Sequence, residues 1–75
     1  MKEQTIVIYP ANNPPHNERN VCGFDSWINQ WRLAVYLPQT ERWMDDEGLD
    51  FRPEQITQWF DFPNGDDTIV YKTLA

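Results

Sequence analysis

The sequence has one cysteine, few cations and no long apolar run. Cys22 alone cannot form an intramolecular disulfide, which excludes a disulfide-stapled secreted scaffold and favours a reducing compartment. The longest apolar run, residues 6–9, is far shorter than the ~20 residues of a membrane span or the ~7–15 of a signal-peptide core. Six Lys and Arg are too few for a surface that contacts nucleic acid or an anionic membrane. We therefore expect a cytoplasmic protein that binds neither.

Acidic and aromatic residues are abundant instead. The 75 residues include 12 Asp and Glu, which give a net charge of −6, and four Trp, three Tyr and four Phe. This length permits one small domain spanning residues 1–75, which would bury only about 60% of its unfolded surface. The large rings exclude a disordered acidic tail and offer a core in place of disulfides. The sequence contains no metal-ligand cluster and no nucleotide-binding loop, so we expect neither metal nor cofactor.

Several segments have the composition of strands. Residues 5–9 are β-branched and aromatic and end at Pro10, and residues 68–73 have the same character. Residues 31–37 alternate in polarity, and we expect residues 41–44 to return beside them after a turn at 38–40. The turn-forming residues 63–67 predict a second hairpin, which would join the segment before them to residues 68–73. Residues 11–23 contain two prolines and predict a long loop.

Two segments have features of both a helix and a strand, and we favour a strand at 31–37, with a short helical turn possible before it. Within 24–37, Trp27, Trp31 and Val35 have helical spacing behind an N-cap at Asp25 or Ser26, whereas its second half alternates as a strand does. Within 53–60, a Pro-Glu start favours a helix and the following alternation favours a strand. The predicted fold is α+β or mostly β, a small antiparallel sheet of four to five strands with at most one short helix.

The acidic surplus lies entirely in the second half of the chain. Residues 1–36 hold three cations and three acids, whereas residues 37–75 hold three cations and nine acids, mostly within 45–54 and 61–67. One interpretation is that these acids only keep a small domain soluble. The other is that they form one face that imitates the charge of DNA and binds a basic partner. The predicted partner-binding residues are Asp45, Asp46, Glu47, Asp50, Glu54, Asp61, Asp66, Asp67 and Trp43.

Trp43 is included because Trp and Arg dominate interface hot spots and Arg42 precedes it. Burial of Trp43 in the core is the alternative.

No residue pattern predicts catalysis. His16 and Cys22 are the obvious base and nucleophile, yet both fall in one expected loop, with no rigid element to hold the geometry that thiol activation needs. A calcium loop with its glycine at Gly48 would place Trp43 at the first ligand position, where an acid is required. Nothing singles out a pair of carboxylates for glycoside hydrolysis. We therefore expect a protein that is not an enzyme.

Residues 56–63, Ile-Thr-Gln-Trp-Phe-Asp-Phe-Pro, resemble a motif in a small family of phage and prophage proteins, the domain of unknown function 551. Residues 34–36, Trp43 and the strand at 6–9 follow the order of that family. The chain departs from it at Gln58, where the family has histidine, and it lacks the family's Trp-Ile segment before the first strand. The resemblance implies an α+β or mostly β mini-domain on a mobile element, with no catalytic residues to transfer.

Three functions follow from these observations. The first is a non-enzymatic phage or mobile-element accessory protein in the host cytoplasm. It would bind a partner with a basic, nucleic-acid-binding surface and in its sharpest form inhibit a CRISPR effector or restriction enzyme. The second is a structural or assembly module, possibly homodimeric, whose acids serve only solubility. The third is a small-ligand site or minor enzyme that uses the Pro-rich loop.

Overall fold

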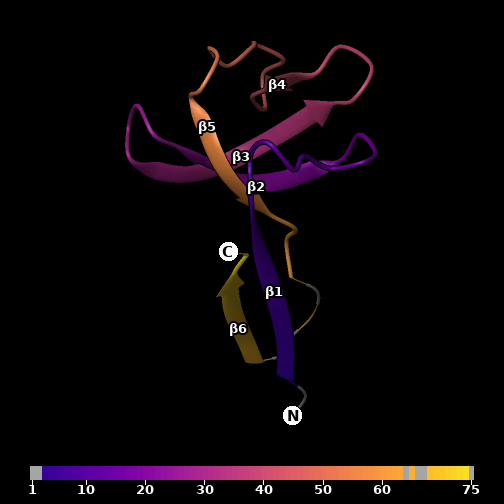
Figure 1. Ribbon diagram of the computed structural model, residues 1–75, viewed down its shortest axis with the longest axis vertical. Helices are drawn as coiled ribbons and strands as arrows, with labels where there is room; N and C mark the ends of the chain where they lie inside the picture. The colour runs from indigo at the N-terminus through magenta and orange to yellow at the C-terminus, as the bar shows by residue number, and fades with distance from the viewer. Residues whose placement is uncertain (1–2, 64, 66–67, 75) are drawn as a thin grey trace.

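The structure is a computed structural model that describes residues 3–63, 65 and 68–74. Its six strands are β1 (Glu3–Pro10), β2 (Asn20–Asp25), β3 (Gln30–Leu37), β4 (Arg42–Met44), β5 (Ile56–Phe60) and β6 (Thr68–Thr73). They form one sheet in the order β4-β3-β2-β5-β1-β6, and the described residues include no helix (Figure 1). The prediction of a mostly β fold is confirmed, with six strands where four to five were expected.

Both ambiguous segments form strands. In the first, β2 and β3 pair antiparallel from Asn20↔Val35 to Asp25↔Gln30, and the residues proposed to start a helix form the turn between them. This turn closes at Asn29, whose φ of 59° is one that asparagine tolerates better than most residues. The predicted loop 11–23 is therefore too long, because β2 begins at Asn20 and has a partner on each side. In the second segment, β5 begins at Ile56, three residues after the proline expected to start a helix.

The predicted hairpin around residues 38–40 is confirmed. β3 and β4 pair antiparallel, with Tyr36 opposite Trp43 and their rings 5.0 Å apart in an edge-to-face contact. The turn is closed by a hydrogen bond of 3.2 Å from the amide of Thr40 to the carbonyl of Leu37. Local signals suffice here because the two strands are neighbours in sequence and in the sheet.

The predicted hairpin across residues 63–67 is wrong, although the strand at 68–73 is present. β5 lies between β2 and β1, and it pairs antiparallel with both. β6 instead pairs parallel with β1, from Glu3↔Thr68 to Ile8↔Thr73. Turn-forming residues specify where a chain reverses but not which strands pair afterwards. Here β5 fills a central position in the sheet, and β6 takes the free edge of β1.

One face of the sheet carries the hydrophobic core. Val21, Ala34 and Trp59 form its buried cluster, and three partly buried rings pack against them, those of Tyr9, Trp43 and Phe51. We call this the core face. The chain approaches so closely here that a Cβ on Gly23 would lie 3.0 Å from the Cβ of Ala34.

Two loops cover the core face. From residues 11–19, Asn13 accepts a 2.9 Å hydrogen bond from Nε1 of Trp59, and the guanidinium of Arg19 lies 5.5 Å from the centre of the Trp59 ring. From the segment after β4, Phe51 donates its amide to the carbonyl of Trp43 over 2.9 Å. The core face is therefore enclosed by residues distant in sequence, as its low exposure requires.

The opposite face carries a second set of rings. Because side chains alternate along a strand, Phe24, Trp31 and Phe60 point away from the core cluster, which holds Val21, Ala34 and Trp59 on the same strands. The rings of Phe24, Trp31, Phe60 and Tyr71 contact one another in that order, with centroids 5.0–5.1 Å apart. We call this surface the aromatic face.

Candidate functional site at the acidic loop

Five of the predicted binding acids lie in one loop between β4 and β5, which we call the acidic loop (residues 45–54). It begins with a tight turn that Asp45 organises. The Oδ1 atom of Asp45 accepts hydrogen bonds from the amides of Glu47 and Leu49, each of 2.9 Å, and Gly48 supplies the left-handed φ of 81°. The turn therefore holds the Asp45 carboxylate against the protein and leaves Asp46 and Glu47 exposed.

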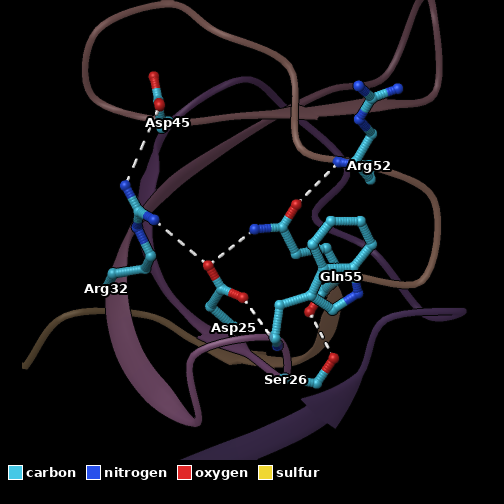
Figure 2. Close-up of polar contacts among 7 residues, drawn as sticks. Asp25, Ser26, Arg32, Asp45, Arg52 and Gln55 are labelled. Atoms are coloured by element: carbon cyan, nitrogen blue, oxygen red, sulfur yellow. Dashed lines mark hydrogen bonds and ion pairs between the residues drawn. The ribbon is translucent and has the colours of Figure 1, made fainter.

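A buried carboxylate anchors this loop to the sheet (Figure 2). Asp25, at the end of β2, is 0% exposed. Its Oδ1 accepts the amide of Trp27 over 3.0 Å, and its Oδ2 accepts Nε2 of Gln55 over 2.8 Å and Nη1 of Arg32 over 3.2 Å. Burial alone would raise the pKa of Asp25, but these hydrogen bonds stabilise the anion and hold its pKa below the usual range.

The partners of Asp25 reach both ends of the acidic loop. Arg32 places Nη2 4.0 Å from Oδ2 of Asp45, at the start of the loop. Gln55, directly after the loop, accepts the amide of Arg52 on its Oε1 over 2.9 Å, and its carbonyl accepts the amide of Ser26 over 2.8 Å. The loop is thus fixed at two points to β2 and β3, as Figure 2 shows. Its exposed carboxylates are held on a rigid base.

The acids of the loop differ in their partners. Arg42 forms an exposed ion pair of 3.3 Å with Asp50, and Asp45 faces Arg32. Such exposed pairs contribute about 0–1 kcal/mol. Within residues 3–63, 65 and 68–74, no ion pair involves three exposed acids of the loop or one acid of the preceding turn: Asp46, Glu47, Glu54 and Glu41. The turn before β4 and the acidic loop, which carry these four acids, lie at the end of the molecule drawn at the top of Figure 1.

A groove of about 530 Å³ opens beside these acids. Its lining residues are Glu41, Arg42, Trp43, Leu49, Asp50, Phe51, Arg52 and Pro53. Trp43 was proposed either as a core residue or as an interface anchor, and it has both environments. Its half-buried ring packs against the core cluster and also forms part of the groove wall. Leu49, 61% exposed, adds apolar surface to the groove.

The remaining predicted acids lie elsewhere. Asp61 follows the far end of β5, so the five residues of that strand separate it from the acidic loop (Figure 1). Its carboxylate accepts two hydrogen bonds from Arg19, of 2.7 and 3.1 Å. Asp66 and Asp67 lie outside the described residues. The structure therefore brings five of the eight predicted acids into one loop, and it places Asp61 apart from them.

Cys22 and His16, the candidate nucleophile and base, lie in different environments. Burial raises the pKa of the Cys22 thiol, which is opposite to the activation that a nucleophile needs. His16 is exposed and lines a separate groove of about 490 Å³ with residues 37–40. In the described part of the chain, no group of three or more His, Cys, Asp or Glu is placed to hold a metal ion. No helix among those residues has the length and hydropathy needed to cross a membrane.

No family model matches the chain, and no curated protein or solved structure gives a significant match. The likeness of residues 56–63 to the phage family therefore stays a prediction.

Sequence reasoning missed two residues of the site, Asp25 and Gln55. Asp25 resembles a helix N-cap, and only the β2–β3 register shows that it shares a face with Val21 and Arg32. Gln55 carries no signal of its own, because its partners lie in other segments.

Proposed function

We propose that this chain is a non-enzymatic accessory protein of a phage or mobile element that binds a partner protein in the host cytoplasm. The partner carries a basic, nucleic-acid-binding surface, and the acidic loop with Glu41 makes the contact. One observation supports this proposal above the others. Among the described residues, three exposed carboxylates without ion pairs, those of Asp46, Glu47 and Glu54, stand on a loop that the Asp25 network fixes at both ends, and a fourth, Glu41, lies in the turn before β4. A rigid cluster of this kind loses little entropy on binding and attracts cations at long range.

In the most specific form of this proposal, the protein inhibits a CRISPR effector or a restriction enzyme. The nucleic-acid sites of such enzymes are lined with Lys and Arg that otherwise contact phosphates. Carboxylates in these positions would exclude the nucleic acid, and Trp43 and Leu49 in the adjacent groove would add apolar contact. Asp61, Asp66 and Asp67 stay predicted contacts that could extend the surface along the molecule.

The test measures DNA cleavage by a purified CRISPR effector and by a restriction enzyme, with increasing amounts of the protein. We expect inhibition that weakens several-fold as salt rises from about 50 to about 200 mM, because the contact is electrostatic. The variant D46N/E47Q should lose inhibition. The matched variant E3Q/E18Q removes two exposed acids from other segments and should keep it.

Binding that does not depend on salt would contradict the proposal. Equal loss of inhibition in both double variants would show that net charge matters and the acidic loop does not. A protein that inhibits neither enzyme would exclude the inhibitor form for them, and binding of an arginine-rich peptide would then test the simpler contact.

A further inference from the structure

The aromatic face is left partly uncovered. Its row of four rings crosses β2, β3, β5 and β6. Trp31 and Tyr71 are 40% and 52% exposed, whereas Phe60 between them is 9% exposed. On the core face the equivalent strand positions are closed, with Val21 and Ala34 at 0% and Trp59 at 3%. Contiguous apolar surface of this kind on a small protein usually marks a contact with another molecule.

This face also carries almost no charge. The six strands contain two acids, Glu3 and Asp25, and alternation with Tyr9 and Val21 places both on the core face. One charged strand residue, Arg42, alternates onto the aromatic face at the β4 edge, where it is ion-paired with Asp50. No acid of the six strands therefore lies on the same face as these rings.

The geometry of the rings indicates the class of ligand. Neighbouring rings meet at 59–66°, so no two neighbours in the row present coplanar faces. Bases or sugar rings stacked in series need such platforms, and nucleic acid would also need cations that this surface lacks. An uneven apolar surface is suited to interdigitation with the side chains of another protein.

We infer that the aromatic face is the contact surface of a homodimer. A partner with a basic surface would find no strand carboxylate on this face, whereas a second copy would present the same neutral rings and no strand carboxylate of its own. A two-fold axis through the face would pair identical patches, which is the commonest symmetry of soluble oligomers. The contact differs from the acidic loop and leaves that loop free for the proposed partner.

The size of the face sets the strength of the dimer. The 36 strand residues, each rising about 3.3 Å on strands about 4.8 Å apart, offer an area on the order of 600 Å² per copy. This area is below the ~800 Å² per partner of a standard stable interface, so we expect a weak dimer that depends on protein concentration. Two copies of charge −6 also repel each other, and added salt screens that repulsion. Self-association should therefore strengthen with salt, whereas the contact of the acidic loop should weaken.

Sedimentation velocity over about a hundred-fold range of protein concentration, at low and high salt, tests this inference. We expect a monomer–dimer equilibrium that shifts toward dimer as concentration and salt rise. The variant Y71E places a charge in the exposed ring position and should weaken dimerisation at least about ten-fold. The matched variant L49E makes the same change at a side chain that is 61% exposed in the acidic loop, and it should dimerise as the native chain does.

Cys22 provides a second measurement. Its side chain points to the aromatic face, whereas the next residue in β2, Gly23, lies on the core face. Cys22 is the only cysteine in the sequence. Its alkylation should slow as protein concentration rises in the native chain and in L49E, but not in Y71E. Circular dichroism of Y71E at low concentration separates a lost contact from a lost fold.

Three outcomes would overturn the inference. The first is a native chain that stays monomeric at every concentration and salt, and the second is a dimer that Y71E leaves intact. The third is a monomeric chain whose inhibition of the nuclease is lost in Y71E, which would assign the aromatic face to the basic partner. Failure of the homodimer would leave nuclease inhibition by the acidic loop unchanged, so the two proposals fail separately.

Discussion

The two faces of this single sheet differ in how far loops cover them. The core face is enclosed by residues 11–19 and the acidic loop, and Val21, Ala34 and Trp59 are almost completely buried. The aromatic face is covered only in part, because Phe60 and Ile6 are buried whereas Trp31 and Tyr71 stay exposed. A chain of 75 residues thus has enough loop to cover one face well. Folding should depend mainly on the core face, and association on the aromatic face.

We expect the largest loss of stability from a substitution of Trp59, on the core face. Its ring is 3% exposed, stacks on Tyr9 at 4.8 Å and donates a hydrogen bond to Asn13. We expect W59A to reduce the free energy of unfolding by about 3–5 kcal/mol, enough to unfold a marginal domain. Urea denaturation followed by circular dichroism measures this change. The control W27A, at a ring that is 62% exposed, should stay within about 0.5 kcal/mol of the native chain.

A substitution of Asp25 tests whether its buried negative charge stabilises the fold. We expect D25N to cost about 2 kcal/mol at neutral pH, because it leaves Arg32 and Gln55 without their anionic acceptor. The figure lies below the ~3–5 kcal/mol of a fully buried pair, since Arg32 is partly exposed. The matched control D61N breaks an exposed ion pair with Arg19 and should cost at most about 1 kcal/mol.

The pH dependence of stability follows from the same carboxylate. Because its folded pKa is lowered, Asp25 contributes its full stabilisation above the ordinary unfolded pKa of about 4. That contribution is lost as pH falls through the lower folded value. Urea unfolding of the native chain between neutral and strongly acidic pH should show this loss, and D25N should lack this part of it. Parallel pH profiles for the two chains would contradict the assignment.

A smaller difference in stability is expected between substitutions at two adjacent residues that lie on opposite faces. A Cβ on Gly23 would lie 3.0 Å from Cβ of Ala34 and 3.4 Å from Cγ2 of Ile56, so we expect G23A to cost about 1–2 kcal/mol through overpacking. C22A, at the adjacent position on the aromatic face, should cost less than about 1 kcal/mol. Thermal unfolding of both variants would check the order. A G23A variant as stable as the native chain would show that the strands can separate at this point.

Two tyrosines give the smallest and most direct comparison. Tyr71 touches Phe60 edge-on and is 52% exposed, so Y71S should lower the stability of the monomer by about 0.5–1 kcal/mol. Tyr9 stacks on the buried Trp59, and Y9S should cost more than Y71S. Both are measured by urea denaturation at low protein concentration, where self-association is negligible. If Y71S were the more damaging variant, the ring contacts of the aromatic face would contribute more to stability than the stacking of Tyr9 on Trp59.

Local sequence was sufficient where neighbouring segments pair. The alternation in residues 31–37 and the turn at 38–40 predicted the β3–β4 hairpin, and the β-branched run at 68–73 predicted β6. The same reasoning failed for the hairpin across 63–67, because β1 lies between β5 and β6. The helical spacing of Trp27 and Trp31 left the choice between helix and strand open, because it does not distinguish a helix from a turn followed by a strand.

The site was predictable in composition but not in arrangement. The cluster of acids in 45–54 is visible in the sequence, and so is Trp43 beside Arg42. Their support is not visible, because Asp25, Arg32 and Gln55 come from three segments that meet only in the folded sheet. The separation of Asp61 from the acidic loop depends on the course of β5 in the same way. A single sequence does not show which distant strands will pair.

The parallel pairing of β1 with β6 has a consequence for how the chain reaches its native state. Glu3 is paired with Thr68, so β1 cannot acquire its outer neighbour until the chain has been synthesised as far as β6. Closing so long a loop costs entropy before any contact repays it, and such topologies fold slowly. Until β6 pairs with it, the β-branched run of β1 has an open edge. That interval is when this protein is most exposed to aggregation and to chaperone binding.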